Sequence, residues 1–149
     1  MAKYSAVGSQ TLTTSRATAL TVASNASTAQ RCKLYEVWFA NLTPADLVTQ
    51  NLVERITAVG TSTAVTPRPL DIGDRAAQAS AGSNHTGEPT YVSNSSIITI
   101  PLNHRGTFRW VAYPGGEIVT PATANYGVGL NALHASATSD WTAGAMWEE

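Results

Sequence analysis

The sequence contains little charge, a single cysteine and no long apolar run. Of its 149 residues only 13% are charged, and the formal net charge is −1 at pH 7. The arginines and lysines are scattered singly, so they form no basic stripe of the kind that binds nucleic acid. No apolar run approaches the roughly 18 residues that a membrane-spanning helix needs, and no basic segment followed by an apolar stretch opens the chain. We therefore expect neither a nucleic-acid partner nor a membrane partner.

Residues typical of catalysis or metal binding are also scarce. Cys32 is the only cysteine, which excludes an intramolecular disulfide, and its apolar surroundings favour a small buried side chain over a reactive thiol. The histidines, His85, His104 and His134, lack the spacing typical of metal ligands. Neither a Gly-x-Ser-x-Gly nucleophile motif nor a phosphate-binding loop is present. The sequence thus predicts no catalytic residue, no metal site and no cofactor.

Small residues take the place of charge, since Thr, Ser and Ala make up more than a third of the chain. A surface of hydroxyl and methyl groups cannot repel its neighbours electrostatically, so it is well suited to close packing against other proteins. At this length the chain has room for one domain with a core of its own.

Residues 31–42, Arg-Cys-Lys-Leu-Tyr-Glu-Val-Trp-Phe-Ala-Asn-Leu, give the strongest strand signal. The segment is rich in aromatic and β-branched residues and contains neither glycine nor proline. Its apolar residues fall on both parities, with Leu34 and Trp38 on one and Val37 and Phe39 on the other. A strand that is apolar on both faces is covered on both faces. We take it as the central strand, covered inside a sandwich or against another subunit.

Further alternating or apolar segments, separated by turn residues, predict the other strands. They are residues 51–59, 63–66, 91–92, 96–102, 107–113, 117–120, 126–134 and 141–149. About eight short strands predict an all-β, single-domain β-sandwich or jelly roll.

Local signals refine this strand pattern. Residues 96–102 and 107–113 flank a turn-like segment and predict a hairpin. Asp71 is a candidate N-cap for a short helix over residues 75–78. Gly127 and Gly129 share a parity on which a neighbouring backbone or aromatic ring can approach closely.

The first 30 residues carry few apolar side chains. Residues 17–23 suit an edge strand with a weak apolar face. We therefore divide the chain into an extended N-terminal arm with a first strand, residues 1–30, and a β-sandwich domain, residues 31–149, with a long loop at 67–90. The arm buries too little to be ordered alone, so we expect a neighbouring subunit or shell protein to order it. The alternative is an ordinary edge strand within its own subunit.

Two groups of residues are candidates for contacts with a partner. In the arm they are Tyr4, Val7, Leu12, Leu20 and Val22. At the other end of the chain they are Trp141 and Trp147, which share a parity and belong either to the core or to an interface.

Two segments resemble small structural proteins of tailed bacteriophages. One is residues 53–71, Val-Glu-Arg-Ile-Thr-Ala-Val-Gly-Thr-Ser-Thr-Ala-Val-Thr-Pro-Arg-Pro-Leu-Asp, and the other runs from Gly116-Glu-Ile to Trp147. Proteins of this kind are similar to capsid decoration, or cement, proteins, which are β-rich, lack enzymatic activity and bind in many copies at symmetry axes of the head. The resemblance implies a virion protein on the capsid surface, synthesised in the host cytoplasm, whose partners are the major capsid protein and its own copies. A homotrimer is favoured by analogy, and a dimer is possible.

Physical reasoning leads to a compatible function. A shell must resist the pressure of packaged DNA, and a cement protein adds buried contact area across the joints between capsomers without needing chemistry. A carbohydrate- or receptor-binding jelly roll, such as a head-fibre or tail-fibre tip, is the alternative, and exposed aromatic residues along a groove would favour it. A third hypothesis, a jelly-roll enzyme, requires histidines and carboxylates clustered in a pocket.

Overall fold

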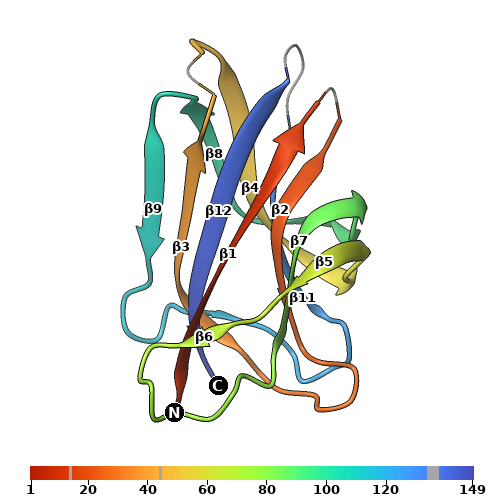
Figure 1. The fold of residues 1–149 in the computed structure, drawn as a ribbon, viewed down its shortest axis with the longest axis vertical. Helices are drawn as coiled ribbons and strands as arrows, with labels where there is room; N and C mark the ends of the chain where they lie inside the picture. The colour runs from red at the N-terminus through yellow and green to blue at the C-terminus, as the bar shows by residue number, and fades with distance from the viewer. Residues whose placement is uncertain (14, 44, 134–137) are drawn as a thin grey trace.

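The computed structural model describes residues 1–13, 15–43, 45–133 and 138–149. Within these ranges there is no helix, and twelve strands form two antiparallel sheets that pack as a sandwich (Figure 1). The strands are β1 (Lys3–Leu12), β2 (Ala17–Ala23), β3 (Lys33–Asn41), β4 (Val48–Ala58), β5 (Thr61–Val65), β6 (Arg68–Pro69), β7 (Ser80–Gly87), β8 (Thr90–Asn103), β9 (Thr107–Val111), β10 (Ile118–Val119), β11 (Gly127–Leu133) and β12 (Ser139–Glu148). The expected all-β class is confirmed.

Sheet A is built around the two ends of the chain. Its strand order is β10-β3-β12-β1-β6, and β9 pairs with β3 on the edge that β10 also uses. β1 pairs with β12 from Lys3↔Glu148 to Leu12↔Ser139, and β12 pairs in turn with β3. In Figure 1 the two termini lie close together at one end of these strands. The first and last strands of the chain therefore form the middle of sheet A.

Sheet B has the strand order β5-β7-β2-β11-β4-β8. All seven residues of β2 are buried, so this strand is covered on both faces. On the outer face the Tyr91 ring lies against Gly129, where a Cβ atom would come within 2.5 Å of the Tyr91 hydroxyl. The expectation that an aromatic ring approaches this glycine is confirmed.

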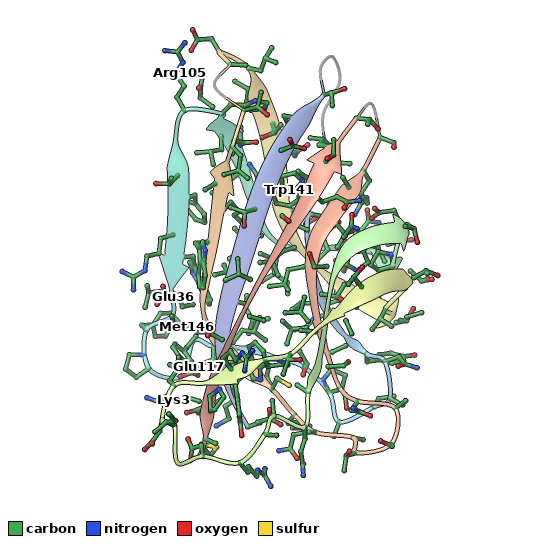
Figure 2. The ribbon with its side chains drawn as sticks, viewed as in Figure 1. Lys3, Glu36, Arg105, Glu117, Trp141 and Met146 are labelled. Carbon is green, nitrogen blue, oxygen red and sulfur yellow. The ribbon has the colours of Figure 1, made fainter. Side chains whose placement is uncertain are left out.

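The largest side chains of the core between the sheets are aromatic residues of β1, β3 and β12. Tyr4 and Trp147 are fully buried with ring centroids 6.1 Å apart, and Phe39 and Trp141 lie 6.0 Å apart. Figure 2 shows Trp141 on the long strand β12 in the middle of the molecule. Burying each of these rings contributes about 2 to 3 kcal/mol. Sheet A thus supplies most of the large side chains of the core.

A β-bulge explains the apolar residues on both parities of β3. The pairing with β12 shifts between Met146 and Trp147, which leaves Tyr35 without a Cα partner on β12. Because the shift reverses the alternation, Leu34 and Val37 both point into the core. On the outer side Trp38 is only partly covered. Within its own chain the strand is therefore covered on its inner face only, and coverage of its outer face by another subunit stays a prediction.

β1 and β2 take the place of the expected extended N-terminal arm. β1 lies between β12 and β6, and β2 lies between β7 and β11, so residues 1–30 are part of both sheets and no domain boundary follows them. The apolar pattern does not reveal this segment because β1 and β2 are held in part by backbone pairing, in which serine and threonine take part as well as valine does. The alternative for residues 17–23 is right that they pair within their own subunit and wrong that they form an edge strand, since β2 has a neighbour on each side.

Three local expectations are corrected as well. β8 and β9 do not pair as a hairpin, because β8 pairs with β4 in sheet B and β9 with β3 in sheet A. The loop expected at 67–90 contains β6 and β7, which form through pairing with β1 and with β2 and β5 rather than through strand propensity. At Asp71 the chain makes a turn instead of a helix, and the Asp71 side chain accepts a hydrogen bond from Gly73 N at 2.9 Å. β1, β6 and β7 are strands that the sequence did not predict, and the two expected strands 91–92 and 96–102 are parts of the single strand β8.

The position of β1 predicts that Tyr4 and Val7 respond differently to truncation. Tyr4 is fully buried, while Val7, three residues along the same strand, is 53% exposed. Tyr4→Ala should lower the free energy of unfolding by about 3 to 5 kcal/mol, and the matched control Val7→Ala by about 0.5 kcal/mol. Urea denaturation measures both. Equal small effects would restore the arm interpretation, under which deletion of residues 1–15 leaves the fold intact.

Candidate protein interface

The outer surface of β1, β12, β3 and β9 carries an unusual set of side chains, which we call the sheet A face. Its members are Val7, Glu36, Trp38, Arg109, Val111 and Met146. The register places them in two rows across the strands. One row runs Val7↔Gly144↔Trp38↔Arg109, and the next runs Ser5↔Met146↔Glu36↔Val111. Figure 2 shows Glu36 and Met146 close together on this side of the molecule.

Gly144 fixes the position of Trp38 on the sheet A face. A Cβ atom on Gly144 would lie 1.9 Å from Trp38 Cζ2, so the indole ring lies directly on the glycine backbone. Only a residue without a side chain allows this contact. The ring is thereby held flat across β12, partly exposed to solvent.

The one carboxylate in these rows is neutralised. Glu36 Oε1 and Oε2 accept hydrogen bonds from Arg109 Nε at 2.6 Å and Nη2 at 2.8 Å. The hydrogen bonds from Arg109 lower the pKa of Glu36, although burial acts in the opposite direction, and Glu36 raises the pKa of Arg109. The pair is therefore ionised near neutral pH and adds no net charge to the surface.

A shallow groove of about 350 Å³ lies beside Trp38. Its lining residues are Glu36, Trp38, Phe39, Ala40, Thr107, Phe108, Arg109 and Met146. Apart from the Glu36–Arg109 pair and one threonine, every side chain that borders this groove is apolar.

One flank of the sandwich is open. β8 and β9 are edge strands of the two sheets, and among the described residues each has a single partner strand. The side chains that point inward between them are only partly covered, although several pack against the core. These residues, which we call the open seam, are Ile98, Ile100, Leu102, Phe108 and Trp110. Unpaired backbone groups beside a partly exposed apolar strip are a template for another chain.

A polar cluster covers the outer face of sheet B. Glu54 pairs with Arg16 and accepts hydrogen bonds from Asn131 Nδ2 at 3.0 Å and Ser96 Oγ at 2.9 Å. The Arg16 guanidinium lies 4.4 Å from the centre of the Tyr91 ring. The carboxylate is thus engaged by three donors, which is typical of a structural network rather than of a general base.

The neighbouring part of this cluster is also hydrogen-bonded. Glu88 accepts hydrogen bonds from the Thr18 backbone and hydroxyl, and the Tyr91 hydroxyl lies 2.6 Å from Thr18 Oγ1. His85 Nδ1 lies 2.9 Å from the Thr18 carbonyl, to which the neutral ring donates. Burial raises the pKa of Tyr91 and lowers that of His85. Both side chains therefore stay neutral near pH 7.

Most of the predicted contact residues lie inside the protein. Tyr4, Leu12, Leu20, Val22, Trp141 and Trp147 are all buried in the core of their own chain. They are not accessible to a partner, which corrects the expectation that they form an interface. Only Val7 of that set is on the surface, where it belongs to the sheet A face.

The expectations about catalysis and metal binding concern Cys32 and the histidines. Cys32 is fully buried as predicted, and burial raises the pKa of its thiol to about 11. His134 lies outside the described residues. Within the described part of the chain, no group of three or more His, Cys, Asp and Glu side chains is arranged to hold a metal ion. Likewise, none of the described residues belongs to a helix long and apolar enough to cross a membrane.

Searches against protein-family models, curated proteins and solved structures return no match for this chain. The function of the chain is therefore inferred from the surfaces described above. The sequence placed Trp38 on the opposite parity from Val37 and Phe39, but both faces of this strand were expected to be covered, so an exposed face was not predicted. The role of Gly144 beneath it carries no sequence signal beyond the glycine itself.

The contact between Gly144 and Trp38 predicts strong coupling between the two positions. Gly144→Ala should destabilise the protein by about 1 to 3 kcal/mol, because the new methyl group displaces the indole ring. In a Trp38→Ala background the same change should be neutral or slightly stabilising, since alanine is favoured over glycine in a strand. A double-mutant cycle measured by denaturant unfolding gives the coupling energy. Additive effects would mean that the ring does not lie on Gly144.

Proposed function

We propose that this chain is a non-enzymatic structural protein of a tailed-bacteriophage virion. In this role it is a decoration, or cement, protein that binds the major capsid protein on the capsid surface and stabilises the head across capsomer joints. It is synthesised in the host cytoplasm and joins the shell there. The proposal includes the jelly-roll connectivity expected from the sequence, which stays a prediction.

The sheet A face is the observation that carries the proposal. Tryptophan, methionine and arginine are enriched at protein interfaces, whereas lysine and glutamate are depleted there. The two central rows of this face contain Trp38, Met146 and Arg109, and their only acidic residue is paired. An outward-facing tryptophan held flat on a glycine is a rigid anchor of the kind found at the centre of interfaces.

The size of the sheet A face fits the same role. Four strands at a spacing of about 4.8 Å span roughly 19 Å, and a ten-residue strand is roughly 34 Å long. The whole outer side of these four strands, of which the sheet A face is the central part, therefore has an area on the order of 600 Å². This is near the roughly 800 Å² per partner of a standard interface. Docking here adds contact area to a shell without catalysis.

The open seam supports self-association, which decoration by many copies requires. Its edges offer backbone hydrogen bonds, and its half-covered aromatic residues gain burial when a second copy of the chain packs against them. We propose a homotrimer formed through β8 and β9, which leaves the sheet A face for the shell.

The groove beside Trp38 favours one other function. Partly exposed Trp38 borders it, and an aromatic ring beside a groove is suited to binding a sugar or a receptor. A carbohydrate- or receptor-binding module of a head fibre or tail fibre is therefore the second candidate.

Binding to expanded empty capsids of the phage tests the proposed function. The purified protein should sediment with such capsids, and Trp38→Ala should weaken binding about tenfold or more because it removes the central anchor. Ile72→Ala is the matched control, since Ile72 is fully exposed in the turn after β6 and lies outside the sheet A face. A protein that does not sediment with capsids at any concentration, but binds glycans through the Trp38 groove, would replace the first candidate by the second.

The open seam predicts the oligomeric state. Native mass spectrometry should detect three copies of the 15.7 kDa chain. Thr99→Lys places a charge on the exposed side of β8, and charged edge residues prevent strand pairing, so this variant should be monomeric with an unchanged circular dichroism spectrum. A dimer would correct the stoichiometry. A trimer unaffected by Thr99→Lys would place the self-contact elsewhere.

A further inference from the structure

A pocket of about 450 Å³ lies where the end of β10 in sheet A meets β4, β8 and β11 of sheet B. We call it the two-arginine pocket. It is lined by Arg31, Arg55, Ile56, Val92, Val119, Thr120, Pro121, Tyr126 and Gly127. Its volume falls within the range of small-ligand sites, which is about 300 to 1,000 Å³. The pocket shares no lining residue with the groove on the sheet A face.

Both charged side chains of this pocket are cationic, and neither has an acidic partner. Arg16, Arg105 and Arg109 all form ion pairs, with Glu54, Asp46 and Glu36. For Arg31 and Arg55, by contrast, the described part of the chain provides no ion pair. In a protein with net charge −1, this is a local concentration of uncompensated positive charge.

Arg55 is held in place for binding. Its Nη1 donates to the Val119 carbonyl at 3.0 Å, which fixes the guanidinium and leaves other N–H donors for a ligand. It extends from the middle of β4, whose backbone is paired with both β8 and β11. A guanidinium fixed on a rigid strand loses little entropy when it binds an anion.

The opposite wall of the pocket is apolar and aromatic. Tyr126 and Val92 are 38% and 40% exposed, and Pro121 and Ile56 complete this wall. The backbone around Tyr126 is tied down, since its N donates to Thr123 O at 3.0 Å and its carbonyl accepts from Ser24 N at 2.9 Å. A phenol ring, aliphatic groups and two guanidinium groups lining one pocket suit a ligand that has both a ring and an anionic group.

We propose that the two-arginine pocket binds an acidic sugar, a pyranose bearing a carboxylate. The carboxylate is recognised by Arg55 and Arg31, because the guanidinium fork matches its two oxygens. The C–H face of the sugar ring packs on Tyr126, Val92 and Pro121. This inference goes beyond the proposed attachment to a capsid, since it gives the protein a ligand of its own on a separate surface.

Titration calorimetry of the full chain with four probes tests the proposal. Glucuronic acid and N-acetylneuraminic acid should bind, whereas N-acetylglucosamine and inorganic phosphate should bind at least about tenfold more weakly, because one lacks the charge and the other lacks the ring. Raising the salt concentration should weaken binding of the acids. Equal binding of neutral and acidic sugars, or no binding of either acid, would overturn the proposal. Tighter binding of phosphate would assign the pocket to a simple anion instead.

Variants locate the binding to this pocket. Arg55→Lys and Arg31→Ala should each weaken binding of the acidic sugars about tenfold, and Arg31 is exposed, so its replacement does not threaten the fold. Arg68→Ala, at an exposed position on β6, is the matched control and should bind as the parent does. Sedimentation with capsids should be unchanged in all three variants, which separates this proposal from the proposed function. Unchanged sugar affinity in both pocket variants would contradict the assignment.

Discussion

The pairing of the first strand with the last is the interaction on which the rest of the structure depends. Each residue from Lys3 to Leu12 has a partner on β12, so the middle of sheet A closes only when both ends of the chain are present. This pairing also brings Tyr4 onto Trp147, and through β12 it brings Trp141 onto Phe39 of β3. The contacts are almost as distant in sequence as the chain allows. Their loop-closure entropy must be offset by the burial of these rings, which explains why the largest side chains gather on these three strands.

The sequence predicted the all-β class and most strands, because apolar alternation depends on local pattern alone. It could not predict which strands pair, because pairing is decided by backbone groups that every residue carries. β1 and β7 illustrate this limit, since both consist largely of small polar residues and both lie between two neighbours. The turn between β8 and β9 was recognised by composition, yet a turn does not specify whether its strands remain in one sheet.

The functional surfaces were predicted less well, and the reason is physical. Trp141 and Trp147 lie on the inner face of sheet A and Trp38 lies on its outer face, and no property of tryptophan distinguishes the three. The two-arginine pocket combines residues from four strands and two loops, so neither spacing nor periodicity brings Arg31 and Arg55 together. Likewise the polar cluster around Glu54 arises because Tyr91 folds over Gly129, a contact of which only the glycine half was visible in the sequence.

The position of the termini also determines what remains available for partners. The aromatic residues of both ends are committed to the core. The outer side of sheet A and the edge strands β8 and β9 carry part of the exposed apolar surface, while Leu42, Ile72 and Tyr113 are exposed outside both. The outer side of sheet A is a face of the sandwich, whereas β8 and β9 form its flank, so a partner on one surface does not cover the other. The two-arginine pocket lies at a third place, between the sheets at the end of β10. The proposed self-association, the proposed attachment to a shell and the proposed binding of an acidic ligand therefore depend on different residues of one chain.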